Sequence, residues 1–183
     1  MNTIHRIAIV ATVVVALTLV TASTASATWS LVWSDEFDGT TLDTANWTID
    51  YGNGCPDLCG WGNNELQFYR PQNVEVTGGN LLLTAKADRF AGHHFTSCKI
   101  HSRDKQSFLY GRMEMRAKIP TGQGMWPAFW MMPQDDAYGG WAASGELDIM
   151  EASHGTTTIH GTLHFGRSRP TKPQPAGAST PGG

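Results

Sequence analysis

The chain has 183 residues, of which 40% are hydrophobic and 16% are charged, with 20 glycines, 9 prolines and 7 tryptophans. This composition is typical of a globular protein and excludes a collagen, a coiled coil and a chain that is disordered throughout. The 13 lysines and arginines against 16 acidic residues give a formal net charge of -3. Because no basic field attracts phosphate, we expect no nucleic-acid partner.

The N-terminal segment, residues 1–27, has the pattern of a secretory signal peptide. Arg6 precedes an apolar run at 7–20, and the Ala-Ser-Ala sequence at 25–27 resembles a signal-peptidase site. The run is shorter than the roughly 20 residues of a membrane-spanning helix. We therefore expect a secreted, extracellular protein that begins at Thr28 and leaves the membrane after cleavage. The alternative is an uncleaved anchor.

Residues 28–166 are the predicted folded domain. Turn-forming residues recur about every ten positions, and the short apolar runs between them predict an antiparallel β protein. Strands are expected at 30–33, 74–77, 81–85, 95–100, 110–118, 126–132, 145–151 and 157–165. A glycine turn at 78–80 joins the second of these strands to the third. Residues 111–119 alternate between apolar and charged, which predicts a strand with one buried face.

The three cysteines lie in an oxidising environment if the protein is exported. Cys55 and Cys59 bracket a turn, so a disulfide between them is geometrically reasonable. Cys98 is left over and is expected to be a small buried hydrophobic residue.

The chain ending, residues 167–183, differs in kind from the domain. It has four prolines, no acidic residue and no large apolar residue, so it cannot form a buried strand or helix. We interpret it as a disordered tail or as the product of a frameshift.

Three acidic residues stand close together in the expected strand at 145–151. Glu146 and Asp148 share one strand face, and a β-bulge at 149–150 would return Glu151 to that face. Crowded carboxylates push their pKa values apart, so that one stays protonated as an acid while another stays ionised as a nucleophile. A retaining glycosidase needs such a pair, with its carboxyl groups roughly 5–5.5 Å apart. The alternatives are an exposed acidic strand edge and a calcium site.

Two tryptophans precede the acidic strand. Trp126 and Trp130 are four residues apart and lie on one face if their segment is a strand. Exposed indole rings are flat apolar platforms for sugar rings, although such tryptophans also occur in protein cores.

Six segments carry a resemblance to a known family: LVWSDEF at 31–37, WGNNELQ at 61–67, YGR at 110–112, GQGMWPAFWMMP at 122–133, ASGELDIME at 143–151 and GTLH at 161–164. Together they resemble bacterial laminarinases of glycoside hydrolase family 16, over residues 29–166. The resemblance implies an all-β fold, an antiparallel jelly-roll sandwich of the concanavalin A-like type. It also implies a monomeric enzyme that hydrolyses β-1,3-glucan and requires no cofactor.

The same resemblance assigns roles to individual residues. Glu146 is implied as the nucleophile, Glu151 as the general acid/base, and Asp148 as the residue that tunes their protonation. The implied substrate contacts are Trp126, Trp130, Asn64 and His164. For His164 the alternative is a hydrogen-bonded core histidine. Glu36 resembles a residue near a structural calcium ion.

The sequence departs from the family after residue 166. Family domains continue past the acidic strand, so the C-terminal strands of the sandwich are expected to be missing here. Two alternatives to an active glucanase therefore stay open. One is a glucan-binding sandwich without hydrolysis, which the three retained acidic residues argue against. The other is an inactive truncated fragment.

Overall fold

The structure, a computed structural model, describes residues 28–153 and 158–166. The predicted signal peptide at 1–27 and the predicted tail at 167–183 lie outside the described residues. The chain divides into two units, residues 1–35 and residues 36–183. In the described part of the first unit, Leu31 and Val32 are 80% and 82% exposed and no strand forms. The strand expected at 30–33 is therefore wrong.

The described part of the second unit contains short strands and two 3-10 turns, η1 (Cys59–Gly62) and η2 (Pro71–Asn73). Its strands are β1 (Thr48–Ile49), β2 (Gln67–Tyr69), β3 (Val74–Thr77), β4 (Asn80–Leu83), β5 (Phe95–Ser97), β6 (Ile100–His101), β7 (Ala128–Met131), β8 (Glu146–Glu151) and β9 (His160–His164). The described residues include no α-helix, which confirms the all-β class. Consequently, none of the described segments is a helix of the length and apolarity that a membrane span requires.

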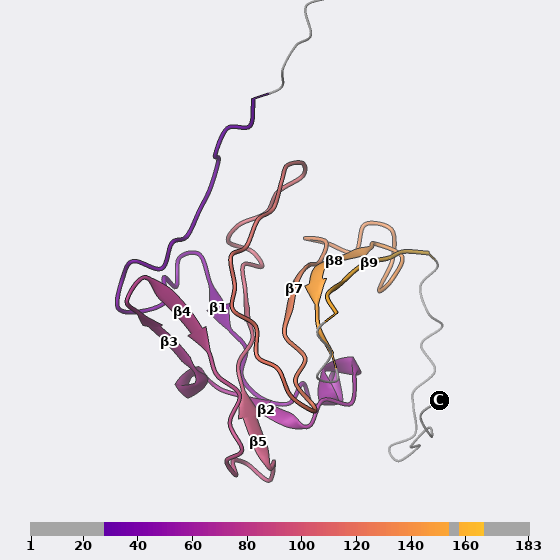
Figure 1. The fold of residues 1–183 in the computed structure, drawn as a ribbon. Coiled ribbons are helices and arrows are strands. Elements are labelled where there is room, and N and C mark those ends of the chain that lie inside the picture. The colour runs from indigo at the N-terminus through magenta and orange to yellow at the C-terminus, as the bar shows by residue number, and fades with distance from the viewer. Residues whose placement is uncertain (1–27, 154–157, 167–183) are drawn as a thin grey trace, which may run out of the picture. The chain divides into compact units, whose positions relative to one another are not determined.

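Strands β3 and β4 form an antiparallel hairpin around the predicted glycine turn (Figure 1). Thr77 pairs with Asn80, so Gly78 and Gly79 form a two-residue loop. Their φ angles are 57° and 70°, the positive values that a type I′ turn requires and that glycine adopts without strain. The turn is confirmed, and β4 ends two residues earlier than predicted.

Strands β2 and β5 pair in parallel, which differs from the antiparallel arrangement expected. Turn η2 and the β3–β4 hairpin lie between them in the chain and supply the crossover that a parallel pair needs. Asn73 at the end of η2 and Thr96 in β5 are both buried. The Nδ2 atom of Asn73 donates to Oγ1 of Thr96 at 3.0 Å and to the carbonyl of Thr84 at 2.7 Å. This polar network ties the hairpin to β5.

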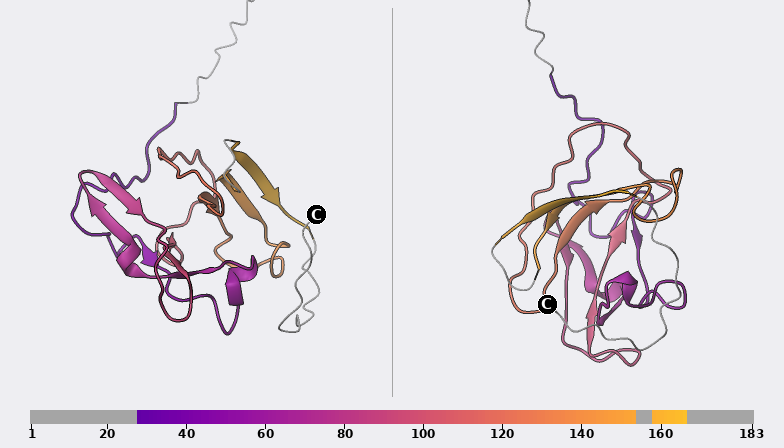
Figure 2. Two further views of the ribbon diagram at one scale, coloured as in Figure 1. Left: turned by 60° about the horizontal axis from the view of Figure 1, so that its bottom comes forward. Right: turned by 90° about the vertical axis from the view of Figure 1, so that its right-hand side faces the viewer.

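Strands β7, β8 and β9 form an antiparallel sheet with β8 in the middle (Figure 2). The strand predicted at 145–151 is confirmed, and those predicted at 126–132 and 157–165 are shorter than expected. Leu147 and Leu163 pair across β8 and β9 and are 45% and 60% exposed. Side chains alternate along a strand, so these leucines lie on the sheet face opposite to Glu146 and Asp148.

The alternating segment at 110–118 forms no strand, although its pattern predicts one. Tyr110 is 87% exposed, and within the described residues no neighbouring strand pairs with this segment. Extended backbone becomes a strand only where a neighbour satisfies its N–H and C=O groups. The alternation therefore predicts which side chains share a face but not whether a partner strand is present.

Candidate active site

The three acidic residues of β8 stand at a break in its register. Ile149 has no opposite residue in the pairing with β7, and the pairing with β9 shifts in the same stretch. This break is the β-bulge predicted at 149–150, and it is confirmed. Because the bulge adds one residue, Glu151 returns to the sheet face of Glu146 and Asp148.

Asp148 lies between the two glutamates and is buried, with 3% of its surface exposed. Its Oδ2 atom lies 3.0 Å from Nε2 of His164 on β9. Burial raises the pKa of Asp148, the charge of Glu146 and a hydrogen bond with Glu146 raise it further, and His164 opposes the rise. Asp148 therefore holds a proton more readily than an ordinary aspartate and can donate it to Glu146 in a hydrogen bond.

Each glutamate accepts a hydrogen bond from an indole N–H outside β8. Trp141 donates through Nε1 to Oε2 of Glu146, and Trp126 donates through Nε1 to Oε1 of Glu151 at 3.1 Å. The ring of Trp141 also packs against His164, with 5.6 Å between the ring centroids. Bonds from N–H groups to carboxylates are among the stronger hydrogen bonds, so they orient both glutamates.

Trp141 belongs to a tight loop that precedes β8. The hydroxyl of Ser144 accepts a hydrogen bond from the backbone N–H of Tyr138 at 3.0 Å and donates to the carbonyl of Gly139 at 2.6 Å, which closes the loop. Trp141 is not among the site residues predicted from the sequence. The available signal was a tryptophan five residues before Glu146, in a segment rich in small residues.

The two tryptophans expected to contact sugar lie beside the acidic residues. Trp130 pairs directly opposite Asp148, and Trp126 reaches Glu151. The backbone N–H of Ala152 donates to the carbonyl of Pro127 at 3.1 Å, which continues the pairing of β7 and β8 toward Trp126. Trp126 and Trp130 are 48% and 38% exposed, so both present apolar ring surface next to the carboxylates.

The remaining predicted site residues belong to other parts of the chain. Asn64 is exposed in the loop after η1, with a left-handed φ of 57°, and no hydrogen bond among the described residues joins it to the acidic residues. A disulfide joins Cys55 to Cys59 just before that loop. Cys98 is half-buried and outside any disulfide. Glu36 is exposed.

One group of described residues brings three potential metal ligands together. Ligand atoms of Glu146, Asp148 and His164 all lie within 4.8 Å of one another. Glu36 is not a member of this group, and residues 28–153 and 158–166 contain no second cluster of this kind. The calcium site expected near Glu36 therefore stays a prediction.

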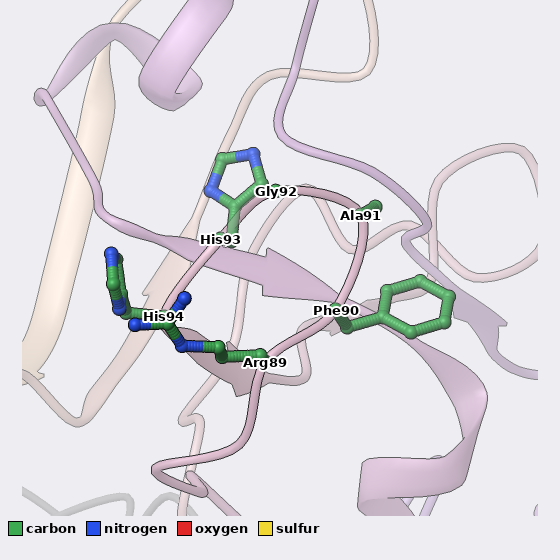
Figure 3. Close-up of a pocket in the computed structure, with 6 residues that line it drawn as sticks. All are labelled: Arg89, Phe90, Ala91, Gly92, His93 and His94. Atoms are coloured by element: carbon green, nitrogen blue, oxygen red, sulfur yellow. The ribbon is translucent and has the colours of Figure 1, made fainter.

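A hollow of about 290 Å³ lies in the loop that leads into β5 (Figure 3). Its lining residues are Arg89, Phe90, Ala91, Gly92, His93 and His94. Two backbone hydrogen bonds between Phe90 and His93, of 3.1 and 2.9 Å, close this loop. None of the predicted site residues lines the hollow, so it is separate from the acidic residues of β8.

The family described as "Beta-glucan synthesis-associated protein SKN1/KRE6/Sbg1" matches residues 8–158. The chain belongs to this family. It is 46% identical over 163 residues to a glucan endo-1,3-beta-glucosidase A1 from Niallia circulans, and this alignment covers 81% of this chain and 24% of that protein. It is 44% identical over 143 residues to a beta-glucanase from Rhodothermus marinus, which covers 74% of this chain and 48% of that one.

The catalytic domain of an endo-1,3-beta-glucanase (laminarinase) from Thermotoga petrophila has a similar structure. The TM-score is 0.72 at 39% identity, over 76% of this chain and 57% of that one. These matches confirm the resemblance to bacterial laminarinases and, with it, the jelly-roll fold class. The chain thus spans between about a quarter and somewhat over half of the length of these proteins. The catalytic roles expected of individual residues stay predictions.

Proposed function

We propose that this chain carries the catalytic face of a secreted, retaining endo-glycosidase that hydrolyses β-1,3-glucan. The observation that carries the proposal is the bulged strand β8, which places Glu146, Asp148 and Glu151 on one face. A retaining glycosidase needs a nucleophilic carboxylate and a carboxylic acid on neighbouring positions of the substrate cleft. The similar proteins are named for hydrolysis of β-glucans, which supports this class of substrate.

In the first step, Glu146 attacks the anomeric carbon and forms a covalent glycosyl-enzyme. The hydrogen bond from Trp141 holds Oε2 of Glu146, which leaves Oε1 to attack. Protonated Asp148 donates to Glu146, and this contact stabilises the ionised nucleophile before the bond forms. At the same time Glu151 gives its proton to the departing glycosidic oxygen.

In the second step, Glu151 acts as the base. Having lost its proton, it accepts one from a water molecule, and the resulting hydroxide attacks the anomeric carbon and releases Glu146. The hydrogen bond from Trp126 occupies Oε1 of Glu151, so Oε2 is the oxygen that carries the proton. Glu151 thus returns to its starting state at the end of each turnover.

Binding of the glucan is assigned to the aromatic and polar residues around this face. Trp126 and Trp130 stack on sugar rings, while His164 and Asn64 contact sugar hydroxyls. The chemistry uses carboxylates alone, so we propose no required cofactor and a structural calcium ion at most, near Glu36. We further propose a monomer that leaves the membrane after signal cleavage and binds no nucleic acid.

Release of reducing sugar from laminarin by the purified full chain is the direct test. We expect activity in the wild type, loss of at least about a thousandfold in Glu146→Gln, and unchanged activity in Glu114→Gln. Glu114 is an exposed glutamate that pairs with Arg112 and serves as the matched control. Sedimentation of the chain with insoluble glucan, without hydrolysis, would instead favour the binding-protein alternative. If the chain neither binds nor hydrolyses glucan, the result would favour the inactive fragment.

Rescue by azide assigns the two glutamates their roles. In Glu151→Ala, azide attacks the glycosyl-enzyme and gives the β-glycosyl azide, because the nucleophile is still present. In Glu146→Ala, azide replaces the nucleophile itself and gives the α-glycosyl azide. A β product from Glu146→Ala would exchange the two assignments, and the anomeric proton coupling in the NMR spectrum distinguishes the products.

A further inference from the structure

The ligand cluster on the sheet face combines two carboxylates with one imidazole. Glu146 and Asp148 come from β8, and His164 comes from β9, where it pairs directly opposite Glu146. One ligand atom from each residue lies within 4.8 Å of the other two. A zinc ion forms ligand bonds of about 2.0–2.2 Å. Small side-chain movements would bring these three ligand atoms to that distance from one ion.

Asp148 supplies an independent sign that the cluster is incomplete. Its side chain is 97% buried, since 3% is exposed, and its Oδ2 atom has no hydrogen-bond partner among the described residues. That oxygen lies 3.0 Å from Nε2 of His164, so both atoms point into the cluster. This contact with His164 is an ion pair rather than a hydrogen bond, and a cation between the two atoms would bind both of them.

We propose that Glu146, Asp148 and His164 bind one divalent transition-metal ion of the zinc type. Imidazole nitrogen with carboxylate oxygen is a typical ligand set for zinc, whereas calcium prefers six to eight oxygen ligands. This site differs from the calcium site that the sequence left open, because it includes His164 and leaves out Glu151. A water molecule occupies the fourth position.

Binding of this ion opposes the proposed glycosidase chemistry. Trp141 occupies Oε2 of Glu146, so the ion takes Oε1, the oxygen assigned to attack the sugar. The metal therefore inhibits hydrolysis, and substrate competes with it. This inhibition rests on the proposed function, but the binding of the ion does not.

Calorimetric titration of the full chain with zinc chloride tests the binding directly. We expect one site that saturates at micromolar zinc, weakened at least about tenfold in His164→Gln and in Asp148→Asn. His94→Gln is the matched control, because His94 is an exposed histidine in the loop before β5, and its affinity should change less than twofold. Far-ultraviolet circular dichroism verifies that each variant folds.

The proposal is overturned if wild type shows no saturable zinc binding, or if both cluster variants bind zinc as tightly as wild type. Loss of binding in His94→Gln alone would place the ion in that loop and equally overturn it. Cobalt provides a second readout, because its visible absorption strengthens when four ligands replace the six waters. In the activity arm, zinc should raise the apparent KM for laminarin while calcium at the same concentration does not. A chain that binds zinc but never hydrolyses laminarin would contradict the proposed function and leave the metal site supported.

Discussion

Replacement of Trp126 by phenylalanine tests whether Glu151 depends on an indole N–H or only on a nearby ring. Phenylalanine keeps a flat apolar ring but lacks the donor that lies 3.1 Å from Oε1 of Glu151. A hydrogen bond to a charged group contributes about 1.5–3 kcal/mol to stability where water is excluded. Trp126 is 48% exposed, so water replaces part of the lost bond, and we expect a loss of about 1 kcal/mol.

That loss corresponds to an about fivefold lower kcat/KM on a laminarin oligosaccharide. The constant kcat/KM reports the step in which the leaving group departs and Glu151 gives up its proton. An aryl glycoside with a dinitrophenyl leaving group needs little protonation, so its kcat/KM should change less than about twofold. Initial rates with both substrates, measured side by side, give the comparison.

Trp130→Phe is the matched control for this experiment. Trp130 lies on the same face opposite Asp148, and among the described residues its indole bonds neither glutamate. Trp130→Phe should lower kcat/KM by the same factor for both substrates, because the replacement alters only the apolar surface. Equal losses on the two substrates in Trp126→Phe, or no loss on either, would refute the role given to the indole N–H.

Three further predictions concern stability and reactivity. Burial raises the pKa of Asp148 above its ordinary value of 3.8. Protonated Asp148 therefore contributes fully to the stability of the fold at a pH below 3.8, and this contribution is lost as the pH rises through the raised pKa. Asp148→Asn should therefore gain stability relative to wild type between pH 3.5 and pH 7 in urea titrations, and parallel pH curves would contradict this. Burial raises the pKa of Cys98 to about 11, so at pH 8 iodoacetamide should modify it about tenfold more slowly than free cysteine, a difference that urea removes. Leu163→Ala should lower the free energy of unfolding by less than about 1 kcal/mol, because the Leu163 side chain is 60% exposed. Val76→Ala should lower it by about 2 kcal/mol, because Val76 is only 5% exposed. A larger loss at Leu163 would mean that this sheet face is covered.

The features that follow from local pattern could be predicted from the sequence. The turn at Gly78 and Gly79 requires positive φ, and the bulge at 149–150 is the local change that puts three acidic residues on one face. Strand pairing is not local. The segment at 110–118 has the alternation of a strand but no partner among the described residues, while β2 pairs with β5 although its three residues carry almost no pattern.

The candidate site shows the same division. The spacing of Glu146, Asp148 and Glu151 indicated one face, because a strand repeats every two residues. The bond from Trp141 to Glu146 depends on how the loop before β8 closes through the hydroxyl of Ser144, and no periodicity encodes that closure. For Trp126 the expected ring surface is present, but its N–H has a second function that spacing alone does not indicate.

The bulge also separates the surroundings of the two glutamates, and this asymmetry supports the roles proposed for them. On the N-terminal side of the bulge, Glu146 has Asp148, His164 and Trp141 around it. These groups can donate hydrogen bonds to its carboxylate and favour the ionised form that a nucleophile needs. On the C-terminal side, Glu151 accepts a hydrogen bond from Trp126 on one oxygen, and the other oxygen remains open for proton exchange with substrate and water. A group that must gain and lose a proton in every turnover is better placed where only one of its oxygens is fixed.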